Sequence, residues 1–304
     1  MISNFSMRIT KTVLVLSVVT VTVSVAHAQN RGQYLPGVAG LNSGIQAPPG
    51  VTYANLFSYY SAGKLKGNAG QTLPVTGNYT VAVDQNLIFY TTKHKFLGAD
   101  YGATLDLMIA HGSVTVERFG SAGATGFGDL YAEPINLGWH KKKADIKVAY
   151  GFVAPTGTGG VSSDYWGHDI TVASTFYLNK MKTWQFSVNT VTEFHQKKRH
   201  QDLKVGNNTN LEYGLGKTFI ANKGQQLWQL GLVGYAEWQF TDDTGTAANP
   251  ALARLHDRVF AAGPEVGLII PKWKASFAVR FEPEFGARNR TQGHILTVGF
   301  VKSF

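Results

Sequence analysis

Apolar and polar residues alternate along the last part of the chain. Between residues 273 and 285, aromatic and aliphatic side chains occupy every second position, and charged ones such as Arg280 and Glu282 lie between them. Side chains in a strand point alternately to opposite faces, so this segment is predicted to be a strand with one apolar and one ionic face. A turn over 286–292 and a second alternating run that ends at Phe304 complete a hairpin.

This pattern is typical of a transmembrane barrel. A soluble antiparallel sheet also alternates, but it seldom has aromatic residues on one side and charges of both signs on the other. A barrel requires that arrangement, because lipid lies outside it and water inside it. A single hairpin also fits a half-buried strand of a soluble sandwich, so the prediction depends on the rest of the chain.

Comparable runs recur from residue 51 onward. With the final hairpin they make twelve strands, and an even number is typical of bacterial single-chain barrels. In the fourth run the apolar phase changes beside Pro134, which predicts a bulge there because proline cannot donate to the ladder. The first ten runs cover residues 51–59, 81–89, 103–109, 130–139, 146–152, 170–178, 184–195, 211–219, 228–240 and 260–270.

The connections between these runs support the same fold. Short turns alternate with longer loops, and in outer-membrane barrels the short turns are periplasmic. Tryptophans at 139, 184, 228 and 273 adjoin short turns, as an interfacial girdle would. We therefore predict an all-β fold, a transmembrane antiparallel up-and-down β-barrel of about twelve strands over residues 51–304. The short turns are 141–143, 179–182, 221–224 and 271–272, and the other connections are 61–78, 112–125, 155–166, 197–209 and 241–257.

Residues 1–28 have the pattern of a secretory signal peptide. Arg8 and Lys11 precede the uncharged run 12–25, and Ala26-His27-Ala28 provides a small-x-small cleavage site. We expect the mature chain to reach a bacterial outer membrane. Residues 29–50 are rich in Gly and Pro and have no clear period. They are either a plug tucked into the barrel lumen or a periplasmic tail.

Composition excludes several kinds of chemistry. The chain has no cysteine, so disulfides and thiol catalysis are excluded. Its net charge is +9, or +7 once Arg8 and Lys11 are removed with the signal. A nucleic-acid partner is not expected, because the export signal is present and no basic helix or zinc pattern appears. The charge fits anionic outer-membrane lipid and lipopolysaccharide phosphates as partners, or simply solvated side chains.

No enzyme, cofactor or metal site is predicted. Neither the G-x-S-x-G elbow of hydrolases nor the H-E-x-x-H spacing of zinc proteases occurs. A lipid or ester hydrolase whose site is assembled from separate strands stays an alternative, because local motifs do not reveal such a site.

Charged residues in the predicted strands are expected to face the lumen. On the lipid side an Arg or Lys would cost ~2–4 kcal/mol near the midplane. Two interpretations are open: a polar constriction that a substrate passes, with Arg280 balancing the carboxylates, or a salt-bridge network that fills a narrow barrel. The predicted lumenal residues are Asp84, Asp106, Glu193, Glu212, Glu237, Glu265, Arg280, Glu282 and Glu284.

A second candidate group lies at strand ends. Asp129 and Glu133 flank the expected bulge at Pro134, and bulges are frequent beside functional sites. Pro155 and Gly157 end the fifth strand and open a Gly-rich loop. These residues are either parts of a gate or ordinary turn formers.

Several short stretches resemble a known family. Their order and spacing, with GFGDLYAEPINLGW followed by GFVAPTG, are similar to those of outer-membrane proteins linked to meta-pathway phenol degradation. The stretches are Tyr34-Leu35-Pro36-Gly37, Pro48-Pro49-Gly50, Gly126-Phe127-Gly128-Asp129 with Pro134, and Pro155-Thr156-Gly157.

The resemblance implies passage of small hydrophobic, often aromatic, compounds across the outer membrane, a role broadly similar to that of long-chain fatty-acid transporters. It carries over no catalytic or binding residues. A nonspecific polar porin is the alternative that an ionic lumen favours. The barrel-assembly machinery reads a signal at the C-terminus of outer-membrane proteins, in which the residue two positions before the end is usually apolar or aromatic. In this chain that residue is Lys302.

Overall fold

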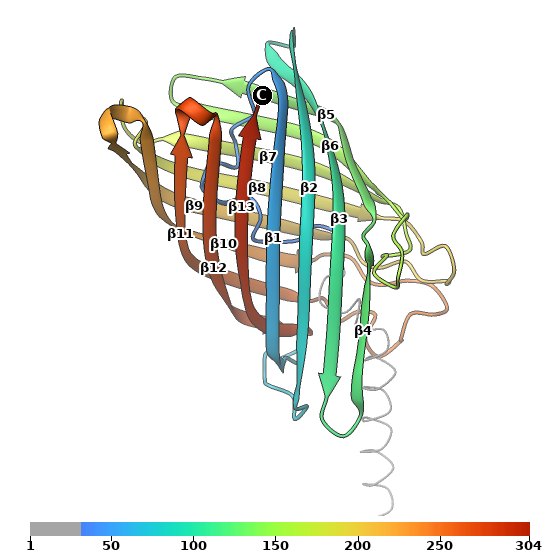
Figure 1. The fold of residues 1–304 in the computed structure, drawn as a ribbon. Coiled ribbons are helices and arrows are strands. Elements are labelled where there is room, and N and C mark those ends of the chain that lie inside the picture. The colour runs from blue at the N-terminus through green and yellow to red at the C-terminus, as the bar shows by residue number, and fades with distance from the viewer. Residues whose placement is uncertain (1–31) are drawn as a thin grey trace, which may run out of the picture.

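The structure, a computed structural model, describes residues 32–304, and the predicted signal peptide lies outside them. The strands form one antiparallel sheet that closes on itself (Figure 1). Its thirteen strands fill twelve positions in the wall, because β4 and β5 both lie along β3. This confirms the predicted barrel. The strands are β1 (Gly50–Leu65), β2 (Gly77–Phe96), β3 (Ala99–Val116), β4 (Gly120–Phe127), β5 (Leu130–His140), β6 (Ala144–Ala154), β7 (Gly167–Tyr177), β8 (Trp184–His195), β9 (Asn208–Ala221), β10 (Gln226–Gln239), β11 (Arg258–Ile270), β12 (Ala275–Arg288) and β13 (Thr291–Ser303).

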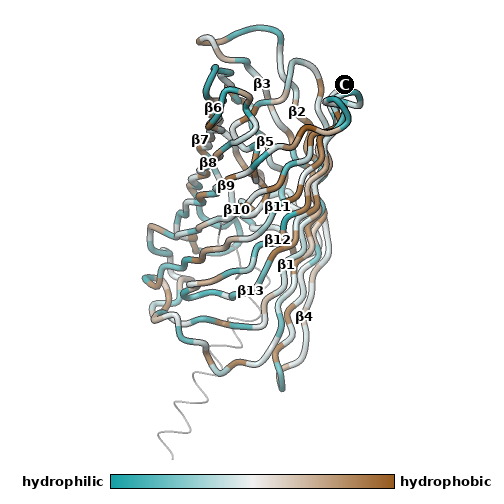
Figure 2. The backbone as a smooth tube through the Cα atoms, turned by 90° about the vertical axis from the view of Figure 1, so that its left-hand side faces the viewer, coloured by the Kyte–Doolittle hydropathy of each residue, from teal (hydrophilic) through white to brown (hydrophobic). Residues whose placement is uncertain are grey.

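The outer surface of the wall is apolar. In β8, Trp184 and Phe186 are exposed, whereas Gln185 and Ser187 between them are buried. Figure 2 shows such alternation of hydrophobic and hydrophilic residues along the strands. An apolar exterior around a polar interior is the arrangement of a barrel in lipid. No helix within residues 32–304 is long and apolar enough to cross a membrane.

Short turns gather at the end of the barrel where the C-terminus lies (Figure 1). They include the two 3₁₀ turns η3 (Asn222–Gly224) and η4 (Pro271–Trp273). The longer loops between β6 and β7, β8 and β9, and β10 and β11 lie at the other end. The short-turn end is therefore periplasmic by the usual asymmetry of these barrels.

The loop predicted over 112–125 is wrong. Residues 99–116 and 120–127 form the hairpin of β3 and β4, and residues 61–65 and 77–78 of the loop predicted over 61–78 also belong to strands. β2 has 20 residues, about twice the ~9–11 that span a bilayer. In β4, Gly, Ala and Thr replace the apolar alternation on which the prediction relied.

The bulge predicted beside Pro134 is confirmed. The pairing of β5 with β6 shifts between Ala132 and Ile135, and that of β3 with β5 shifts at the same level. The Tyr101 hydroxyl donates a hydrogen bond of 2.7 Å to the Pro134 carbonyl, which ties the bulge to β3.

Asp84 faces outward, so its predicted lumenal position is wrong. Residues directly paired across antiparallel strands share a face, and Asp84 pairs with Phe57 and Ile109, both exposed. Its carboxylate accepts a hydrogen bond of 2.5 Å from Asn55, and the next residue, Gln85, is the one that points inward. The error has a physical cause: the alternating apolar residues from which the face of β2 was predicted, Val81, Val83, Leu87 and Phe89, line the lumenal cavity.

Candidate functional site: a lumenal cavity beside the N-terminal segment

The N-terminal segment, residues 32–49, lies inside the barrel. The backbone amides of Gln33 and Tyr34 donate to one oxygen of Glu193 at 2.6 and 2.8 Å. The other anchor is Glu212, which accepts from the Ala39 amide at 2.9 Å and from the Tyr34 hydroxyl at 2.5 Å. Burial and the Glu212 carboxylate raise the pKa of Tyr34 well above its ordinary value, so the hydroxyl remains a donor. Two predicted lumenal carboxylates thus hold this segment.

The side chain of Leu41 packs the middle of the N-terminal segment against the wall. Leu41, in the 3₁₀ turn η2 (Gly40–Asn42), is only 1% exposed and fills a hollow left by glycines of β9 and β10. A Cβ atom at Gly216 would lie 2.7 Å from the Leu41 side chain, so the glycines of these strands make room for it. The Ser187 hydroxyl donates to the Leu41 carbonyl.

Arg280 links the segment to the wall. Its Nε lies 3.1 Å from a carboxylate oxygen of Glu265, and its terminal nitrogen donates to the Gly37 carbonyl at 3.2 Å. Glu282 lies on the same lumenal face of β12 and is buried. Charges that the sequence predicted to balance one another therefore meet in the lumen.

A second ion pair lies nearer the long-loop end. Arg290, between β12 and β13, is 2.8 Å from Glu237, and both side chains are 1% exposed. Burial lowers the pKa of the Arg290 guanidinium, but the neighbouring carboxylates of Glu237 and Asp257 outweigh this and raise it above its ordinary value. The nearby Glu284 accepts from the Tyr60 hydroxyl. Sequence reasoning missed Arg290 because it falls within a predicted turn.

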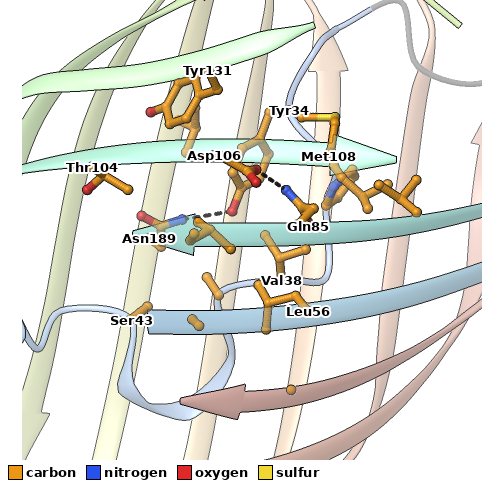
Figure 3. Close-up of a pocket in the computed structure, with 18 of the residues that line it drawn as sticks. Tyr34, Val38, Ser43, Leu56, Gln85, Thr104, Asp106, Met108, Tyr131 and Asn189 are labelled. Carbon is orange, nitrogen blue, oxygen red and sulfur yellow. Dashed lines mark hydrogen bonds between the residues drawn. The ribbon is translucent and has the colours of Figure 1, made fainter. Parts of the chain in front are cut away.

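The opposite side of the lumen is apolar. A cavity of 840 Å³ lies between the N-terminal segment and the wall formed by β1, β2, β3 and β5 (Figure 3). Tyr34 and Val38 line it from the segment. The sequence assigned part of this lining, on β2, to the lipid side. We call the following residues the apolar wall: Ala54, Leu56, Val81, Val83, Leu87, Phe89 and Met108.

Polar residues of the same strands also line the cavity, among them Thr52, Gln85, Thr91, Thr104, Asp106, Glu133 and Asn136. The Gln85 side-chain amide donates to Asp106 at 2.7 Å, and the two residues lie on adjacent strands. Across the cavity, the Asn189 amide donates to the Tyr34 hydroxyl at 3.3 Å (Figure 3). Asp106, a predicted lumenal residue, thus stands on the apolar side of the lumen, at a distance from the two ion pairs.

Asp129 organises the loop after β6. It lies between β4 and β5, and its carboxylate accepts hydrogen bonds from the Gly157 amide at 2.8 Å and from the Ser162 hydroxyl at 2.6 Å. The amide and hydroxyl of Ser163 donate to the other oxygen, at 2.8 and 2.5 Å. The structure therefore joins two candidate gate residues, Asp129 and Gly157, and Pro155 lies in the connected loop, directly after β6.

Glu133 has a different position from Asp129. It points into the barrel and accepts from the Thr104 hydroxyl at 2.9 Å and from the Asn136 amide at 2.7 Å. Pro134, next to it, is exposed at the bulge. These residues shape the cavity rim rather than the loop.

Asp129→Ala should loosen the loop at residues 155–166. Four hydrogen bonds are removed, and a net loss of about 2 kcal/mol would raise local opening roughly thirtyfold. Limited proteolysis of the reconstituted protein measures this as faster cleavage in that loop. Asp129→Asn keeps one acceptor oxygen, so its rate of cleavage should lie between those of the wild type and Asp129→Ala. Equal cleavage of the wild type and Asp129→Ala would contradict the assignment.

Comparison with known proteins extends this description. A family model described as "Putative MetA-pathway of phenol degradation" matches residues 62–300. The chain belongs to this family. No curated protein matches this member of the phenol-degradation family in sequence.

Its fold is that of several solved outer-membrane barrels. An outer membrane channel from Pseudomonas putida F1 matches with a TM-score of 0.68 at 13% identity, over 90% of this chain and 100% of the other. The β domain of a Bordetella autotransporter matches with a TM-score of 0.52 at 13% identity, over 84% and 100% of the two chains. Together with the apolar exterior, this fold places the phenol-degradation family member in the bacterial outer membrane.

Proposed function

We propose that this protein admits small hydrophobic or aromatic compounds through the outer membrane. The observation that carries the proposal is the apolar wall, which faces the lumen and borders a cavity of 840 Å³. A polar porin has a polar interior on all sides, and this barrel does not. The volume lies within the ~300–1,000 Å³ of ligand pockets. The description of the family, which links it to phenol degradation, agrees with such a substrate.

The N-terminal segment serves as a plug in this proposal. It is held by Glu193 of β8, Glu212 of β9 and Arg280 of β12, so these groups bind protein rather than solutes. A nonspecific porin would leave them open to ions. We therefore favour the plug over the periplasmic tail.

Other partners follow from the location. We propose that lipopolysaccharide phosphates contact basic groups at the long-loop end, and that the barrel-assembly machinery reads β13 despite Lys302. A lipid or ester hydrolase has less support, because Glu193, Glu212 and Arg280 are engaged with the N-terminal segment.

Filling the cavity should block uptake. Ala54 is buried on the apolar wall, so Ala54→Phe would occupy the path, whereas Ala82→Phe places the same ring on the outer face of neighbouring β2. In a strain that lacks the gene, we expect uptake of labelled naphthalene to fall at least fivefold. Wild type and Ala82→Phe should restore it and Ala54→Phe should not. If the deletion strain takes up naphthalene as fast as its parent, the proposed function is wrong.

A further inference from the structure

Asp106 is a carboxylate that stands among the residues of the apolar wall. Its side chain is 2% exposed, and it pairs across the sheet with Leu87 on one side and Tyr131 on the other. Gln85 lies in the next row of the same face, between Leu56 and Met108. A charged group among such neighbours is costly unless it is paired or hydrogen-bonded.

The pair formed by Asp106 and Gln85 has acceptors to spare. A carboxylate only accepts hydrogen bonds, so Gln85 must direct its amide nitrogen to Asp106 Oδ2, at 2.7 Å, and its own oxygen is left over. Neither Asp106 Oδ1 nor Gln85 Oε1 receives a hydrogen bond from residues 32–304, although both atoms are buried. Both residues line the cavity, and Figure 3 shows their side chains directed toward each other within it.

We propose that Asp106 and Gln85 form a recognition site for the hydroxyl group of an apolar cyclic molecule. The inference rests on the proposed function, because it assigns the polar contact of the same cavity. The ligand hydroxyl donates to Asp106 Oδ1 or Gln85 Oε1, and its ring packs on Leu87, Met108 and the Tyr131 ring.

The chemistry of the site favours neutral donors over other ligands. Both free atoms are acceptors, so an ether or a plain hydrocarbon leaves them unsatisfied. A ligand carboxylate, as in a fatty acid, would meet the Asp106 carboxylate at close range and be repelled. A metal ion is not expected, because no group of three or more His, Asp or Glu in residues 32–304 is arranged to hold one. The site therefore selects hydroxylated rings.

The test compares 2-naphthol with 2-methoxynaphthalene, which has the same rings but no donor. Binding is measured by equilibrium dialysis against the full-length protein in nanodiscs, with empty nanodiscs subtracted. A hydrogen bond to a charged group predicts that the wild type binds 2-naphthol about tenfold or more tightly than the ether. Asp106→Leu and Asp106→Asn should reduce this preference, the first to about onefold. Asp84→Asn removes a carboxylate charge from the outer face of β2 and should keep the preference for 2-naphthol.

The outcomes separate the two proposals. If the wild type binds both compounds equally well and Asp106→Leu changes nothing, the hydroxyl site is wrong and the hydrophobic cavity stands. If the wild type binds neither compound, both proposals are wrong. A heat-modifiable band on an unboiled gel checks that each variant is folded, and Asp106→Asn keeps the shape of the side chain should Asp106→Leu fail to fold.

Discussion

Deletion of residues 32–48 should turn the barrel into an open pore. These residues occupy the lumen through contacts with Glu193, Glu212 and Arg280, and none of them contributes a strand to the wall. The closed wall of twelve positions therefore persists without them, and its ionic groups become hydrated. In planar bilayers we expect at least a tenfold rise in single-channel conductance over the full-length chain.

Two variants of the full-length chain calibrate that result. Glu193→Gln with Glu212→Gln weakens the acceptors of the segment while leaving it in place, so brief openings should appear at intermediate frequency. Glu117→Gln removes a carboxylate from an exposed turn and should leave conductance unchanged. If the deletion variant conducts no better than the full-length chain, the segment is not a plug.

Arg290→Met should destabilise the barrel by about 3–5 kcal/mol. Removing one partner of a buried ion pair leaves the other charge without compensation. Here the uncompensated group is Glu237, with Asp257 and Glu284 nearby. Denaturant unfolding of the detergent-solubilised protein, followed by tryptophan fluorescence, measures the loss of free energy of unfolding.

A matched pair of variants separates the ion pair from general damage. Arg288→Met changes an exposed arginine of the same hairpin and should alter stability by less than about 0.5 kcal/mol. Adding Glu237→Gln to Arg290→Met removes the stranded charge and should recover part of the loss. Equal stability of Arg290→Met and Arg288→Met would show that the pair is not structural.

The barrel could be predicted because its strongest signal is local. In β8 and β12, each alternating run shows by itself which residues face lipid, and the structure confirms those faces. β2 has the same alternation, but its alternating apolar residues face the lumen instead of the lipid. Val83 and Leu87 face a cavity and Asp84 faces outward, so the rule that apolar residues face lipid fails where the lumen is apolar too.

Other features could not be predicted because their causes lie far apart in the chain. Tyr34 donates to carboxylates 159 and 178 positions away, and no local pattern shows that Gly/Pro-rich residues 32–49 fit between strands. Arg290 lies in a turn, and its partner Glu237 lies on a different hairpin, so no local pattern shows the ion pair. The loop bound by Asp129 likewise depends on serines that precede β7.

The 20 residues of β2 have a consequence for how a solute first meets the cell. Roughly half of that length suffices to cross lipid, so the remainder, with the long-loop ends of β1, β3 and β4 (lower end in Figure 1), extends beyond the bilayer. Apolar molecules diffuse poorly through hydrated carbohydrate outside a membrane. The extended strands provide a protein surface that such molecules can contact before they reach the bilayer.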